Sequence, residues 1–153
     1  MRPKFLADSN VGRLARWLRA LGYDAAFEAH VEDGALVRLA LAEGRVLLTR
    51  DLDLMQRRVI ASGQLRAILL ETDQVSGQLR QVARALGLDS GLALTRCLEC
   101  NLELDPRTRA EVAQRVPPHV RATQVRYSEC PGCGRVYWPG THWTRMRSAL
   151  AAL

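Results

Sequence analysis

The chain has 153 residues, and its apolar runs are too short for a signal peptide or a membrane span. Its formal net charge is +6, and Lys4 is the one lysine among 22 basic residues. This arginine excess favours a nucleic-acid partner, because guanidinium groups pair with phosphate, but a GC-rich genome produces the same bias. The composition argues against a secreted, disulfide-rich or membrane-spanning protein, and we expect a cytoplasmic one.

Short apolar runs alternate with segments of helical periodicity in the first ninety residues. The runs predict strands at residues 5–7, 23–27, 45–49 and 67–70. The periodic segments predict helices at about 11–21, 34–43, 52–61 and 76–86. In the first helix, Arg13, Arg16 and Arg19 are expected on the side away from the apolar stripe. This alternation predicts a parallel sheet with helices on its faces.

A junction at residues 91–96 predicts two domains, 1–91 and 92–153. In the second domain we expect a helix at about 106–116, a strand at 123–127 and a last helix from about residue 144. About 60 residues interrupted by a long loop bury little apolar surface, so this domain needs additional stabilisation.

Four cysteines in two identical pairs supply that stabilisation. Cys97 and Cys100 form one Cys-x-x-Cys pair, and Cys130 and Cys133 form the other. Two such pairs deliver four thiolates to one tetrahedral ion, and zinc suits four sulfur ligands best. Two disulfides are the alternative, but in a chain without a secretory signal they are less expected. His142 is a further potential ligand that four cysteines make unnecessary.

Carboxylates follow the predicted strands at their carboxyl ends, where ligands bind in parallel α/β sheets. Asp8 ends the first strand, Asp51 and Asp53 follow the third, Glu71 and Asp73 follow the fourth, and Asp33 opens a helix. Clustered carboxylates repel one another unless a divalent cation binds them, as in sites that hydrolyse phosphodiesters. Each acid also has a simpler interpretation. Asp33, Asp51 and Asp53 suit helix caps, and Glu71 and Asp73 suit loop charges.

The order of several blocks in this sequence resembles the Mut-seven-C RNase domain family, and the resemblance covers nearly the whole chain. The blocks are Asp8, residues 12–24, Glu32–Asp33, residues 48–51, residues 96–101 and residues 130–142. The resemblance implies an α/β fold: a three-layer PIN-like nuclease domain with a mainly parallel sheet, followed by a small zinc ribbon.

It also implies a metal-dependent ribonuclease that acts on RNA. Carried over position by position, Asp8, Asp33 and Asp51 match the family's acids, and Asp53 is a fourth, as in related sequences that read Thr-Arg-Asp-x-Asp. These residues would hold a catalytic Mg²⁺ or Mn²⁺. Glu32 is the alternative to Asp33. Many PIN domains carry another acid after a later strand, which here is Glu71 or Asp73.

Aromatic and basic residues beside the second cysteine pair are candidates for RNA contacts. Aromatic rings stack on bases, which makes Tyr137, Trp138 and His142 candidates. The alternative for Trp138 and Trp143 is that they pack the ribbon against the nuclease domain. Candidate phosphate-binding residues near the acids are Arg13, Arg16 and Arg50.

Three other functions stay open at this point. A non-catalytic RNA-binding adaptor would use the ribbon, and its acids would only cap helices. A phosphatase built on Asp8 is less consistent with the sequence, because Asn10 replaces the usual second acid and Lys4 is the one lysine. A toxin with an antitoxin partner is the third, since many PIN proteins are toxins.

Overall fold

The computed structural model describes residues 2–89 and 91–151. It divides into two compact units, which are described separately below. Unit 1 comprises residues 1–19 and 23–89, and unit 2 comprises residues 20–22 and 90–153. In the described part of the chain, no helix combines the length and the apolar character that crossing a bilayer requires.

Unit 1 is built on a four-stranded sheet whose neighbouring strands are all parallel, in the order β2-β1-β3-β4. The strands are β1 (Phe5–Ala7), β2 (Ala25–Phe27), β3 (Val46–Thr49) and β4 (Ala67–Leu69). The central strands β1 and β3 are nearly continuous apolar runs, as expected for strands covered on both faces. The predicted α/β class and parallel sheet are confirmed.

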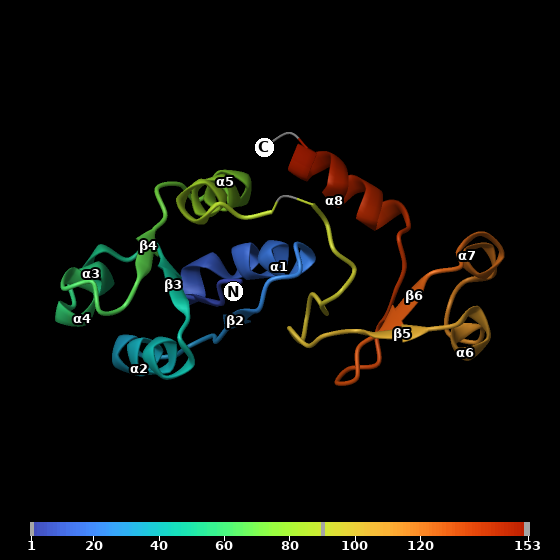
Figure 1. The fold of residues 1–153 in the computed structure, drawn as a ribbon, viewed down its shortest axis with the longest axis horizontal. Coiled ribbons are helices and arrows are strands. Elements are labelled where there is room, and N and C mark those ends of the chain that lie inside the picture. The colour runs from blue at the N-terminus through green and yellow to red at the C-terminus, as the bar shows by residue number, and fades with distance from the viewer. Residues whose placement is uncertain (1, 90, 152–153) are drawn as a thin grey trace. The chain divides into compact units, whose positions relative to one another are not determined.

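Helices cover both faces of this sheet (Figure 1). They are α1 (Gly12–Ala20), α2 (Asp33–Glu43), α3 (Leu52–Met55), α4 (Arg58–Ala61) and α5 (Val75–Leu86), and a 3₁₀ turn η1 (Ser9–Val11) precedes α1. One face packs Leu6 and Leu47 of the sheet against Leu36 of α2, Leu54 of α3 and Ile60 of α4. The helices α1 and α5 lie on the other face (Figure 1).

The order of the strands defines the place where this sheet can bind a ligand. The chain passes from β1 to a neighbour on one side and from β3 to a neighbour on the other. In α/β sheets, ligands bind at such a reversal, outside the carboxyl ends of the two strands. Here these ends are followed by Asp8 and by Arg50–Asp51.

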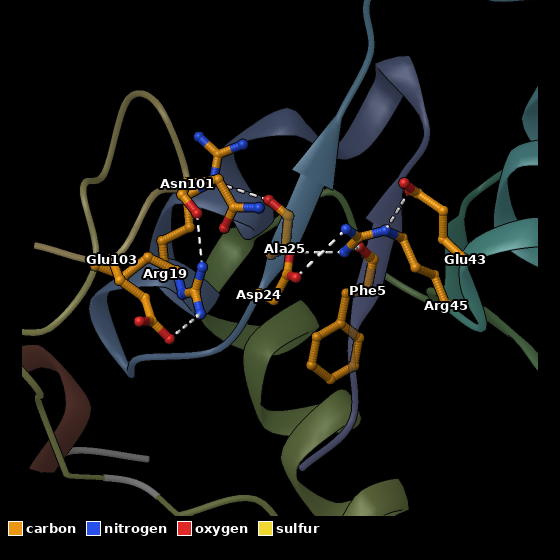
Figure 2. Close-up of polar contacts among 9 residues, drawn as sticks. Phe5, Arg19, Asp24, Ala25, Glu43, Arg45, Asn101 and Glu103 are labelled. Atoms are coloured by element: carbon orange, nitrogen blue, oxygen red, sulfur yellow. Dashed lines mark hydrogen bonds and ion pairs between the residues drawn. The ribbon is translucent and has the colours of Figure 1, made fainter. Parts of the chain in front are cut away.

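At the opposite end of the sheet, where the strands begin, arginine side chains hydrogen-bond to neighbouring strands and loops (Figure 2). Arg45 donates to Asp24 Oδ1 at 2.7 Å, to Glu43 Oε1 at 2.8 Å and to the carbonyl of Phe5 at 3.1 Å. Arg19, expected on the exposed side of α1, is instead 9% exposed and donates to the carbonyl of Ala25 at 2.8 Å. That expectation was wrong, because the β2 backbone offers Arg19 an acceptor.

Unit 2 contains a three-stranded antiparallel sheet in the order β5-β6-β7. Its elements are β5 (Asp105–Arg107), α6 (Arg109–Val112), α7 (Pro118–Thr123), β6 (Tyr127–Glu129), β7 (Val136–Tyr137) and α8 (Thr141–Ala151). One small core cluster of this unit contains Val112, Val116, Val120 and Tyr127, and Trp138 packs against it. Leu98, Met146 and Leu150 are also buried. A core of this size is consistent with a domain that depends on another source of stability.

Several predicted elements have other bounds in the structure. The helix expected at 52–61 is divided into α3 and α4, because Arg57 has an extended ψ of 138° between them. The helix expected at 106–116 begins later, because Pro106 lies in β5 and Thr108 caps α6 in a capping box with Glu111. The strand expected at 123–127 was wrong for most of its length, since α7 extends to Thr123. The last helix begins three residues earlier than expected.

Candidate functional site

A chain of hydrogen bonds joins the ends of β1 and β3. Thr49 Oγ1 donates to Asp8 Oδ2 at 2.7 Å and accepts from the backbone N–H of Asp51 at 2.9 Å. Asp8 Oδ1 accepts from the backbone N–H of Ser9 at 2.7 Å. Thr49 is fully buried and Asp8 is 7% exposed, so these bonds hold the carboxylate in one place. Asp8 and Asp51, which are 43 positions apart in the chain, thus meet at one edge of the sheet.

Asp51 also acts as the N-cap of α3. Its Oδ1 accepts from the N–H of Asp53 at 2.9 Å and from that of Leu54 at 3.4 Å. The capping role that the sequence offered as an alternative for Asp51 is therefore present. The cap uses Oδ1 of Asp51. Oδ2 of Asp51 accepts no hydrogen bond from the described residues, so this oxygen is available to a ligand. Asp53 is exposed in the first turn of α3 and does not cap it.

The sequence allowed Asp33 to be the N-cap of α2, but in the structure it is not. Glu32 occupies the N-cap position without a side-chain hydrogen bond, and Asp33 is the first helical residue. Asp33 is partly exposed, whereas Glu32 is exposed. Among the described residues, neither Asp33 nor Asp53 is hydrogen-bonded through its side chain to Asp8 or Asp51. Asp33 therefore lies in the first turn of α2, where a carboxylate favours the helix dipole, but it is not the N-cap.

The four cysteines of unit 2 form a compact group that could hold one metal ion. Potential ligand atoms of Cys97, Cys100, Cys130 and Cys133 all lie within 4.8 Å of one another. In residues 2–89 and 91–151, no other three or more His, Cys, Asp or Glu side chains form such a group, so the aspartates are less tightly gathered. All four cysteines are free of disulfide bonds, and Cys97 and Cys130 are buried.

Hydrogen bonds position the sulfur atoms. The N–H of Cys100 donates to Cys97 Sγ at 3.3 Å, and the N–H of Gly132 donates to Cys130 Sγ at 3.4 Å. The Tyr137 hydroxyl lies 3.1 Å from Cys97 Sγ and accepts from the N–H of Leu98 at 3.1 Å. Both pairs therefore present their sulfurs to a common centre, which is the arrangement of a ribbon that binds zinc.

The surroundings of the thiols shift the pKa values of Cys100 and Cys133 in opposite directions. Hydrogen bonds from the backbone and side chain of Arg135 lower the pKa of Cys133 to about 6. The hydrogen bond with Cys133, together with desolvation, raises the pKa of Cys100 to about 12. Four thiolates held this close would repel one another, and a divalent metal ion bound between them would remove that repulsion.

The predicted RNA-contact residues of the ribbon differ in their surroundings. The Tyr137 hydroxyl is committed to the cysteine cluster. Trp138 is partly buried and makes an edge contact with Tyr127 at 6.4 Å between ring centroids, so it packs within unit 2. His142 is exposed. It lines a cavity of about 710 Å³ in unit 2, together with Trp138, Trp143, Pro139 and Met146.

The three arginines predicted near the acids are all exposed. Arg13 and Arg16 lie on α1, directly after the η1 turn that Asp8 caps. Arg50 separates Thr49 from Asp51, and its N–H donates to Asn10 Oδ1 at 3.4 Å. All three therefore come from segments next to Asp8 or Asp51 in the chain.

Replacing Thr49 with valine tests the link between β1 and β3. Thr49→Val keeps the shape but leaves an Asp8 oxygen and the Asp51 N–H without a partner, so we expect a loss of about 1–3 kcal/mol in the free energy of unfolding. Urea denaturation measures it. Thr72→Val is the matched control, because Thr72 Oγ1 accepts a single bond from the N–H of Gln74 in a loop. Equal losses in both variants would contradict a special role of Thr49.

Unit 1 is an α/β unit with a parallel sheet, and the four-cysteine cluster of unit 2 is compatible with a zinc ribbon. Residues 3–150 match the family model described as the Mut7-C RNAse domain. Since the match covers nearly the whole chain, the protein belongs to the Mut7-C RNase domain family, which indicates a nuclease-like role. No curated protein and no solved structure matches the chain.

Proposed function

We propose that this protein is a metal-dependent ribonuclease that hydrolyses RNA phosphodiester bonds at the acidic edge of its parallel sheet. Asp8 and Asp51 form the centre of the site, and Asp33 and Asp53 complete the set of acids. The proposal combines the family membership with the geometry at the ends of β1 and β3.

The observation that supports it best is the environment of Asp8. Buried charges in proteins are normally paired with an opposite charge or coordinate a metal. Asp8 is 7% exposed, yet its hydrogen-bond partners among the described residues are neutral: the Thr49 hydroxyl and the N–H of Ser9. In the described part of the chain, no arginine, lysine or histidine forms an ion pair with it. A carboxylate in such a place is suited to bind a cation from solution.

The donor set fits Mg²⁺ or Mn²⁺, since both prefer carboxylate oxygens. Asp8, Asp33, Asp51 and Asp53 would hold the ion, and a bound divalent cation would supply Lewis acidity toward a water molecule and the phosphate oxygens. Thr49 orients the Asp8 carboxylate toward the edge, and the cap on α3 fixes Asp51. Arg13, Arg16 and Arg50 are placed to bind RNA phosphates near this edge.

For unit 2 we propose a structural zinc ion held by Cys97, Cys100, Cys130 and Cys133. The ribbon would also contact RNA, through His142 and the exposed parts of Trp138 and Tyr137. Arginines outnumber acids in this region, which favours a polyanionic partner. We place the domain boundary after residue 91.

The experiment that tests this function measures the initial rate of cleavage of a labelled single-stranded RNA. The protein is first dialysed free of magnesium and manganese under conditions that keep the zinc of the cysteine cluster, and cleavage is compared with MnCl₂, with MgCl₂ and without added metal. We expect cutting with manganese or magnesium and none without added metal. RNA binding without cutting under every condition would instead support the non-catalytic adaptor.

A further inference from the structure

Two arginines from different helices converge on one point beside the acidic edge of unit 1. The point is the position that a Cβ atom on Gly34 would occupy. It lies 3.3 Å from Arg38 Nη1 and 3.9 Å from Arg57 Nη1. Arg38 belongs to α2, one turn after Gly34, whereas Arg57 is the N-cap residue of α4. Nothing in the spacing of these residues along the sequence indicates that they meet.

Neither guanidinium group is engaged within the part of the chain that the structure describes. Both side chains are exposed, and neither makes a hydrogen bond or an ion pair with a described residue. Arg57 follows Asp53 by four residues, a spacing at which helical acids and bases often pair. Here α3 ends before Arg57, and its guanidinium lies over Gly34 instead.

Two like charges held so close repel each other, and an anion between them removes the repulsion. Guanidinium groups bind phosphate oxygens through charge-assisted hydrogen bonds with a fixed geometry. Gly34 keeps the space between the two groups and the helix open. It directly follows Asp33, one of the acids of the proposed site.

We propose that Arg38 and Arg57 form a clamp for one phosphate of the RNA strand, next to the phosphate that is cleaved. The clamp rests on the proposed ribonuclease function and extends it. The acids provide the reacting centre, and the clamp fixes the register and direction of the strand across it. Arg38 and Arg57 are therefore positioning residues.

The test measures RNA affinity rather than cleavage. A fluorescent single-stranded RNA is titrated with the full-length, zinc-loaded protein in a buffer without magnesium or manganese, at several salt concentrations, and fluorescence anisotropy gives Kd. For Arg38→Ala/Arg57→Ala we expect binding about tenfold weaker than the parent. The slope of log K against log salt should fall in magnitude by about 0.7, which corresponds to one lost phosphate contact on a single strand.

The matched control is Arg80→Ala/Arg84→Ala on α5, which removes two exposed arginines four residues apart and the same total charge. We expect it to keep the parental affinity and slope. Arg38→Lys/Arg57→Lys should keep the salt dependence of binding but lose part of the affinity. A lysine ammonium carries the same charge as a guanidinium group but lacks its planar pair of donors. Thermal unfolding followed by circular dichroism verifies that all variants are folded.

Equal affinity and slope for the alanine pair and the control would overturn the clamp, and so would an absence of RNA binding by the parent. Because the assay contains no magnesium or manganese, it is independent of the proposed catalysis. A parent that binds RNA through the clamp but cuts none would refute the ribonuclease and leave the clamp in place. A parent that cuts RNA while the alanine pair binds normally would refute the clamp alone.

Discussion

Asp8→Asn should lower the rate of RNA cleavage at least about 100-fold. The amide keeps the size of the side chain and an oxygen for the Thr49 hydroxyl, but it removes the negative charge that would bind the cation. A lost metal contact of several kcal/mol corresponds to this effect, because each factor of ten in rate is about 1.4 kcal/mol. Initial rates at saturating manganese measure it.

The same substitution should change the free energy of unfolding only slightly. It removes a desolvated charge, but its amide has one oxygen for the two donors that Asp8 accepts from, the Thr49 hydroxyl and the Ser9 N–H, and these two effects oppose each other. Asp89→Asn is the matched control, since Asp89 is an exposed aspartate at the end of unit 1. A parental cleavage rate for Asp8→Asn would show that Asp8 is not part of the catalytic site. A large loss of stability would show that its charge is structural.

Removal of the proposed zinc ion from the cysteine cluster should unfold unit 2. Structural zinc contributes folding free energy directly, and this unit has a small core. We expect about one zinc per chain by elemental analysis. A strong chelator should lower the melting temperature of the ribbon by about 10 °C or more. Two of the three tryptophans, Trp138 and Trp143, lie in unit 2, so their fluorescence reports its unfolding.

Single substitutions refine this prediction. Cys97→Ser should be more destabilising than Cys100→Ser, because Cys97 is fully buried and accepts a backbone hydrogen bond, whereas Cys100 is exposed. Unchanged melting of the protein after chelation, with less than about 0.1 zinc per chain before it, would contradict a structural metal site.

The sequence predicted the sheet well, because continuous apolar runs such as 5–7 and 46–49 are typical of strands buried on both faces. It predicted unit 2 poorly. Pro106 suggested a helix start, but it lies on the edge strand β5, where a missing N–H costs nothing. The capping pair Thr108 and Glu111 was a better signal for the start of α6.

The residues that organise the acidic edge were harder to find from the sequence. Thr49 was identified only as the end of a strand. Its contact with Asp8 joins residues 41 positions apart, and it depends on the pairing of β1 with β3. The convergence of Arg38 and Arg57 likewise depends on how α2 and α4 pack on the sheet. Contacts between residues so far apart in the chain leave no pattern in the local sequence.

The central claim is that the acids at the ends of β1 and β3 cleave RNA with a divalent cation. Its most direct test is cleavage of labelled single-stranded RNA by the parent and by Asp8→Asn/Asp51→Asn, purified identically and free of contaminating nucleases. We predict that the parent cuts with manganese or magnesium and that the double variant does not. Equal cutting by both proteins, or no cutting by either, would contradict the claim.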